Sequence, residues 1–145
     1  MQGTLARAAV AVSGLNFRND RGAIVVNNIG DVTVSGGTFT GNAATDGGAI
    51  ADNSALSGDP RSELGSVNLK DSEVTGNHAG AAGGGIYNDG GEVDAAGTRI
   101  AVNTAAAAGG IADHGTVTVK LTGATVIKNM PDNCEPAGSI TGCSS

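Results

Sequence analysis

Glu73, Asp94 and Arg99 are the residues of this chain whose types could support acid–base chemistry. Each lies in a short β-like segment in which successive side chains point alternately inward and outward, and each occupies an outward position. Two carboxylates and a guanidinium are the minimum for a site that cleaves polysaccharides by acid–base catalysis. A solvated protein surface carries the same residue types, and the sequence favours that interpretation over a catalytic site.

A second set of polar residues follows the Gly-rich segments of the chain. Its members are Asp52, Asn53, Asn88, Asp89, Asp113 and His114. Oxygen ligands of this kind can hold Ca²⁺, but Asp and Asn also form turns without any ion. The sequence favours turns and predicts no cofactor, with Ca²⁺ as the open alternative. It contains no nucleophile motif, phosphate-binding loop or zinc-ligand spacing.

The elements that would position these residues recur along the chain. A short apolar segment precedes a Phe, Val or Ile by seven residues in four copies and by nine in the last. Three residues after that apolar position comes Asn in four copies, whereas the first copy has Asp20. A Gly-rich step ending in Ile follows in four copies, as in Gly48-Ala49-Ile50.

This repeat predicts an all-β, three-sided parallel β-helix (β-solenoid) of about five coils. Each copy supplies three short strands that alternate apolar and polar residues. Asn side chains at one turn of successive coils are expected to hydrogen-bond one another in a structural ladder. The predicted ladder consists of Asn42, Asn77, Asn103 and Asn129. Gly before Ile is expected where neighbouring coils approach closely.

The solenoid is predicted to span residues 1–129, with one inserted loop at 53–65. That loop is either a tolerated surface insertion or a binding loop, and the first interpretation is favoured. Residues 130–145 form a tail with two Pro and the two Cys of the chain, Cys134 and Cys143. We expect a disulfide between them, and hence a secreted or cell-surface location. A two-Cys metal site is the less favoured alternative, because the two histidines, His78 and His114, belong to the coils and not to the tail.

Composition excludes several classes of partner. The formal net charge is −6 and no basic run occurs, which argues against nucleic acid and anionic membranes. No apolar stretch approaches the roughly 20 residues of a membrane span. The chain has two Phe, one Tyr and no Trp, so Ala, Val, Ile and Leu must fill the core.

Phe39-Thr40-Gly41-Asn42 followed by Gly47-Gly48-Ala49-Ile50 resembles the paired FxxN and GGA[I/L/V] repeats of the chlamydial polymorphic outer-membrane proteins. The other copies are degenerate, and together they cover most of residues 10–129. The resemblance implies a right-handed parallel β-helix and an adhesin role at a cell surface. It implies nothing about catalysis.

The expected function is therefore a non-enzymatic secreted or cell-surface module with a structural or adhesive role. Such a module would bind a protein or glycan ligand, or form a homo-oligomer by end-to-end stacking, because solenoid ends carry unpaired strand edges. The alternative is a carbohydrate-active β-helix of the polysaccharide lyase or hydrolase type.

Overall fold

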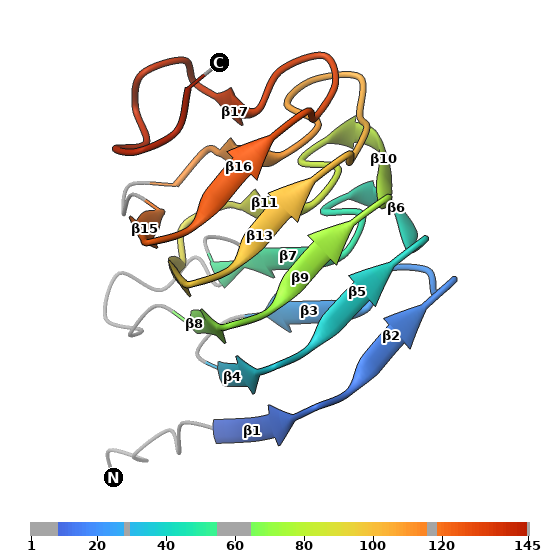
Figure 1. The fold of residues 1–145 in the computed structure, drawn as a ribbon, viewed down its shortest axis with the longest axis vertical. Coiled ribbons are helices and arrows are strands. Elements are labelled where there is room, and N and C mark those ends of the chain that lie inside the picture. The colour runs from blue at the N-terminus through green and yellow to red at the C-terminus, as the bar shows by residue number, and fades with distance from the viewer. Residues whose placement is uncertain (1–8, 28–29, 55–64, 116–118, 145) are drawn as a thin grey trace, which may run out of the picture.

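A computed structural model describes residues 9–27, 30–54, 65–115 and 119–144. These residues form short β-strands joined by turns and contain no α-helix, as Figure 1 shows. Every pair formed by the described strands is parallel, which confirms the prediction of an all-β protein with parallel sheets. The predicted loop at 53–65 falls mostly on residues 55–64, which lie outside the described residues.

Three five-stranded sheets make up most of the structure. Sheet A contains β1 (Ala9–Ser13), β4 (Asp31–Ser35), β8 (Ser66–Lys70), β12 (Glu92–Ala96) and β15 (Lys120–Thr122). Sheet B contains β2 (Asn16–Arg18), β5 (Thr38–Thr40), β9 (Glu73–Thr75), β13 (Arg99–Ala101) and β16 (Thr125–Ile127). Sheet C contains β3 (Ile24–Asn27), β7 (Ile50–Asn53), β11 (Ile86–Asn88), β14 (Ile111–Asp113) and β17 (Cys134–Glu135).

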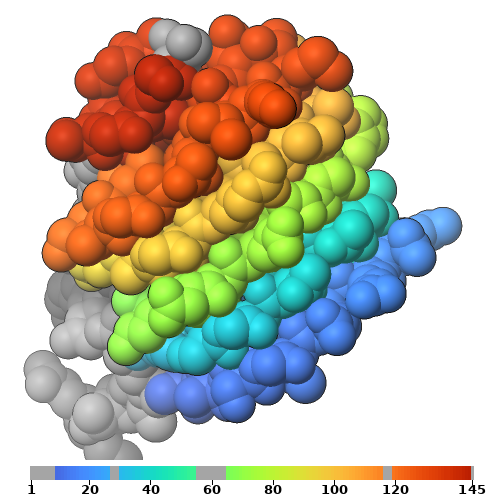
Figure 2. Space-filling model, viewed as in Figure 1, coloured from blue at the N-terminus to red at the C-terminus, as the bar shows by residue number. Residues whose placement is uncertain are grey.

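The chain passes through sheets A, B and C in turn and then returns to sheet A one strand further along. We call one such pass a coil. Strands of successive coils pair in register, so that Phe17 is the partner of Phe39, and Phe39 of Val74. Successive coils appear as parallel diagonal bands in Figure 2. This order is compatible with a parallel β-helix or solenoid.

A fourth, two-stranded sheet lies in chain order between sheets B and C, and the sequence pattern does not predict it. Sheet D pairs β6 (Ala43–Asp46) with β10 (His78–Ala82). Isolated bridges extend it from His78 to Thr104 and from Thr104 to Met130. Its residues are mostly Ala and Gly, which give no apolar alternation for a period of two to reveal.

The core lies between the sheets and is filled by one inward row of side chains from each coil. Val34, Phe39 and Ile50 of the second coil are completely buried. The later coils repeat this row with completely buried aliphatic residues: Val67, Leu69, Val74, Ile86, Val93, Ala95, Ile100 and Ile111. Parallel pairing in register therefore places the apolar side chains of one coil on the corresponding apolar side chains of the next. Aliphatic residues form a continuous core in this way, although the chain has few aromatic residues.

The corner after sheet B requires a left-handed backbone in every coil. Its φ angles are 54° at Asn19, 67° at Gly41, 64° at Gly76, 57° at Val102 and 56° at Lys128. A β-branched residue is strained there, because its Cβ crowds the following carbonyl oxygen. Val102 is also 53 % exposed, so its side chain gains little burial in return.

We therefore expect Val102→Gly to raise the free energy of unfolding by about 1 kcal/mol. Chemical denaturation of the purified variant measures this change. The reciprocal change Gly76→Val, at a corner position with open space around the glycine, should lower stability by a similar amount. A loss of stability in Val102→Gly would contradict the strain argument.

Candidate functional site

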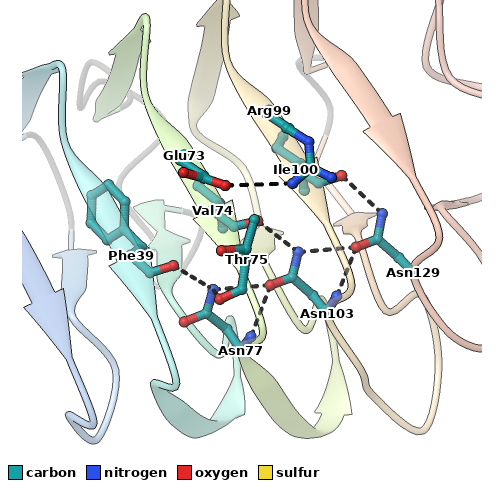
Figure 3. A network of polar contacts seen from close by, with 9 residues as sticks. All are labelled: Phe39, Glu73, Val74, Thr75, Asn77, Arg99, Ile100, Asn103 and Asn129. Atoms are coloured by element: carbon teal, nitrogen blue, oxygen red, sulfur yellow. Dashed lines mark hydrogen bonds and ion pairs between the residues drawn. The ribbon is translucent and has the colours of Figure 1, made fainter.

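The outer face of sheet B carries an ion pair from the residues with potential acid–base roles. Glu73 in β9 and Arg99 in β13 are register partners on neighbouring coils. Arg99 Nη1 lies 3.4 Å from Glu73 Oε1, with the two side chains 46 % and 50 % exposed (Figure 3). A half-exposed pair of this kind contributes little to stability. It can offer charge and hydrogen bonds to a polar ligand.

Asp94, the third of these residues, lies in a different sheet. It belongs to β12 of sheet A, where its register partners are Asn68 and Lys120. Its carboxylate lies 4.0 Å from Lys120 Nζ. The structure thus brings Glu73 and Arg99 together, whereas Asp94 has its own cationic partner in the next coil. The three residues do not assemble the pair of facing carboxylates that glycoside cleavage uses.

The four predicted asparagines form one buried column that joins the coils. Asn77 Oδ1 accepts from Asn42 N at 3.0 Å and from Asn42 Nδ2 at 2.9 Å. Asn103 Oδ1 and Asn129 Oδ1 each accept the same two bonds from the previous asparagine. Each Nδ2 also donates to a backbone carbonyl, such as Asn103 to Val74 O at 2.9 Å (Figure 3). The column satisfies buried polar groups at a corner between strands, which is a structural role.

Asn133 ends this column and is a member that sequence analysis missed. Its Oδ1 accepts from Asn129 N at 3.1 Å and from Asn129 Nδ2 at 3.0 Å. It therefore takes the place that an asparagine of another coil would occupy. It follows Asn129 by four residues instead of 26, so the repeat spacing gave no signal for it.

The first position of the column is Asp20, which cannot complete the pattern. Asp20 N donates to Asn42 Oδ1 at 3.0 Å, as the later asparagines do. A carboxylate lacks the side-chain NH₂ that would donate the second bond. We expect Asp20→Asn to add this bond and to raise the free energy of unfolding by about 1 kcal/mol.

Thermal or urea unfolding tests the Asp20→Asn variant against Asp132→Asn. The control makes the same chemical change at an exposed residue outside the column and should alter stability little. Equal effects in the two variants would show that loss of charge, and not the new hydrogen bond, is responsible.

Of the polar residues that follow the Gly-rich segments, three are buried in sheet C, whereas Asn53, Asp89 and His114 are partly or fully exposed. Asp52, Asn88 and Asp113 share one register position on β7, β11 and β14. Asn88 Nδ2 donates to Asp113 Oδ1 at 3.0 Å, and Asp113 Oδ2 accepts from Val119 N at 3.1 Å. No group of three or more His, Cys, Asp or Glu suited to a metal ion occurs in the ranges that the structure describes.

Asp52 holds the base of the insertion. Its Oδ1 accepts hydrogen bonds from Ser54 N and Ser54 Oγ, and Ser54 Oγ in turn accepts from Gly65 N at 3.0 Å. Asp52 Oδ2 is buried with no hydrogen-bond partner among the described residues, and it lies against Gly91, where a Cβ would overlap it. Burial raises the pKa of Asp52 above its ordinary value; the bonds from Ser54 oppose this shift and the charge of Asp89 adds to it.

Because its pKa is raised on folding, Asp52 binds its proton more tightly in the folded state than in the unfolded state. Its ionisation therefore opposes folding, and stability is gained as the pH falls from neutral toward the ordinary aspartate pKa of about 3.9. We expect wild type to gain stability relative to Asp52→Asn across this range. Urea unfolding at several pH values measures the difference, and a difference independent of pH would contradict it.

Tyr87 and His114 form a ring pair near the base of the insertion. Tyr87 alternates with the buried Ile86 and Asn88 in β11, so its ring lies on the outer side of sheet C. The two ring centroids are 5.4 Å apart. The register partners of Tyr87 are the buried residues Ala51 and Ala112. The ring is partly buried and packs against a small cluster made of Ala82, Ala107, Ala108 and Ala112. Burial raises the pKa of Tyr87, and the charges of Asp89 and Asp46 add to the shift.

The C-terminal tail closes the last coil. Cys134 and Cys143 are joined by a disulfide, and Cys134 lies in β17, which pairs with β14. Ile140 is 2 % exposed and packs against the core. The described part of the chain holds no helix able to cross a membrane.

No family model, curated protein or solved structure matches this chain.

Proposed function

We propose that this chain is a non-enzymatic, secreted or cell-surface module with a structural and adhesive role, built as a right-handed, three-sided parallel β-helix. Sheets A, B and C would be the three sides, with sheet D as a short extra segment at one corner. The disulfide of the tail supports an oxidising compartment. The right-handed coil and the adhesive role follow the resemblance to the repeats of chlamydial polymorphic outer-membrane proteins.

The observation that carries the adhesive role is the position of Tyr87 and His114. This ring pair lies on the outside of a sheet whose inside is a continuous core, and β7 leads from the same sheet into the insertion. Tyrosine contributes a large contact area for little loss of conformational entropy, which makes it frequent at energetically dominant positions of interfaces. The ligand is a protein or glycan that places an apolar or cationic group on the Tyr87 ring, because Asp46 and Asp89 make its surroundings acidic.

The experiment is a screen of glycan arrays and of surface-protein extracts with the full chain, followed by measurement of the affinity of each ligand found. Tyr87→Ala should weaken binding at least tenfold. Thr75→Ala, a substitution on the outer side of sheet B, is the matched control and should leave the affinity unchanged. Failure to find a ligand, or equal loss in both variants, would count against an adhesive role at this surface.

A further inference from the structure

In the described part of the chain, no further coil is stacked on the core side chains of the N-terminal coil. β1, β2 and β3 are the outermost strands of sheets A, B and C, and none has a second neighbour among the described strands. Val10 and Val12 are register partners of Val32 and Val34 and face the core side of sheet A. Val34 is completely buried, whereas Val10 is 53 % exposed. An apolar row at a strand edge is a surface that favours association.

Phe17 presents a flat ring at this end. It stacks on Phe39 with ring centroids 4.7 Å apart and the planes 5° from parallel. Phe39 is completely buried, but Phe17 is only partly buried. Because the two rings are stacked along the direction in which coils succeed one another, the second face of Phe17 points toward the open end.

The opposite end of the stack is different, because the tail covers it. β17 lies outermost in sheet C, Asn133 accepts the last bonds of the asparagine column, and Ile140 is buried. The disulfide between Cys134 and Cys143 ties this tail together. A second copy can therefore not extend the stack from this end without displacing the tail.

We propose that the N-terminal end is the interface of a closed homodimer, in which two copies meet end to end about a twofold axis. The interface is isologous because a covered C-terminal end leaves only another N-terminal end as its match. A twofold axis stacks the two Phe17 rings and pairs the free strand edges in antiparallel fashion. This inference rests on the proposed structural role of the solenoid and identifies its partner as a second copy of this chain.

The charges at this end suit such self-association. Arg18, Asp20 and Arg21 are exposed beside the edge of β2 and alternate in sign. Rotation about a twofold axis reverses their order in the second copy, so arginines of one copy can approach the aspartate of the other. Complementary charges of this kind fix the register of a contact more than they add affinity.

Sedimentation equilibrium of the full chain over a wide concentration range tests the proposal. The expected mass rises to two copies and stops there. Val10→Glu would bury an unpaired carboxylate in the interface and should weaken the dimer by about a hundredfold or more. Val102→Glu is the matched control, since Val102 is also 53 % exposed but lies at the corner after β13, and it should dimerise like wild type.

Leu15→Lys is a second variant at the same end, where Leu15 is 46 % exposed, and it should also give monomers. Thermal unfolding shows whether the variants are folded. A monomeric wild type at all concentrations, masses that grow beyond two copies, or equal dissociation of the Val10 and Val102 variants would each overturn the proposal. If the Val10→Glu variant is monomeric and still binds the ligand of the Tyr87 surface, the adhesive role does not depend on the dimer. If the wild type forms the dimer but binds no ligand, the adhesive role is contradicted and the dimer is not.

Discussion

Replacing Asn103 with alanine is expected to lower the free energy of unfolding by about 3–5 kcal/mol. Asn103 is completely buried at the middle of the asparagine column. Its Oδ1 accepts from Asn77 N at 3.0 Å and from Asn77 Nδ2 at 2.9 Å, while its Nδ2 donates to Val74 O at 2.9 Å and to Asn129 Oδ1 at 3.0 Å (Figure 3).

Alanine removes all four of these hydrogen bonds and supplies no replacement. Asn77 N and Val74 O then lie buried without a partner, and such groups cost about 1–3 kcal/mol each. The small cavity left by the amide adds to the loss. Because the column links successive coils, the destabilisation should appear as a single unfolding transition at lower urea concentration.

Asn68→Ala is the control for the Asn103 variant. Asn68 lies on the outer side of sheet A and donates one bond of 3.4 Å to Ser66 Oγ. We expect its replacement to change stability by less than about 1 kcal/mol. Similar losses in the two variants would show that the column has no special role in joining the coils.

The column could be predicted from the sequence because its residues recur with the coil. Asn42, Asn77 and Asn103 follow an apolar position by three residues in each copy, and the same spacing fixed the registers of sheets A, B and C. When corresponding positions of successive coils pair in parallel, these asparagine side chains lie above one another and can hydrogen-bond along the column. Local repetition was therefore sufficient for the strand order and for the core.

Structural features that do not recur in each coil could not be predicted from the repeat spacing. Asn133 completes the column from a tail without the motif, and sheet D consists mostly of small residues without apolar alternation. The periodicity also predicted that the side chains of Asp94 and Arg99 point outward, but it did not show that the two residues lie in different sheets. Gly97, with a φ of 57°, forms the corner between β12 and β13, so residues five apart in the chain lie on different faces.

The second large effect is expected from Gly84→Ala, which should lower the free energy of unfolding by about 3 kcal/mol or more. A Cβ at Gly84 would lie 2.4 Å from Gly109 O and 2.4 Å from Thr104 O, both backbone atoms of the next coil. A Cβ added at Gly48 or at Gly109 would likewise lie 2.2 Å from a backbone oxygen of the next coil. These oxygens cannot move aside as a side chain would, because hydrogen bonds such as Gly85 N to Gly109 O hold the coils together.

Gly80→Ala separates this clash from the general effect of replacing glycine. Gly80 lies four residues earlier, in β10, and the nearest atoms to an added Cβ are at 3.9 Å. Neither glycine has a φ in the left-handed region, so backbone strain does not distinguish them. Alanine at position 80 should be neutral or stabilise by up to about 1 kcal/mol, since it restricts the unfolded chain. Urea unfolding of both variants measures the difference, and a Gly84→Ala protein as stable as wild type would mean that the coils can separate at this step without loss of packing.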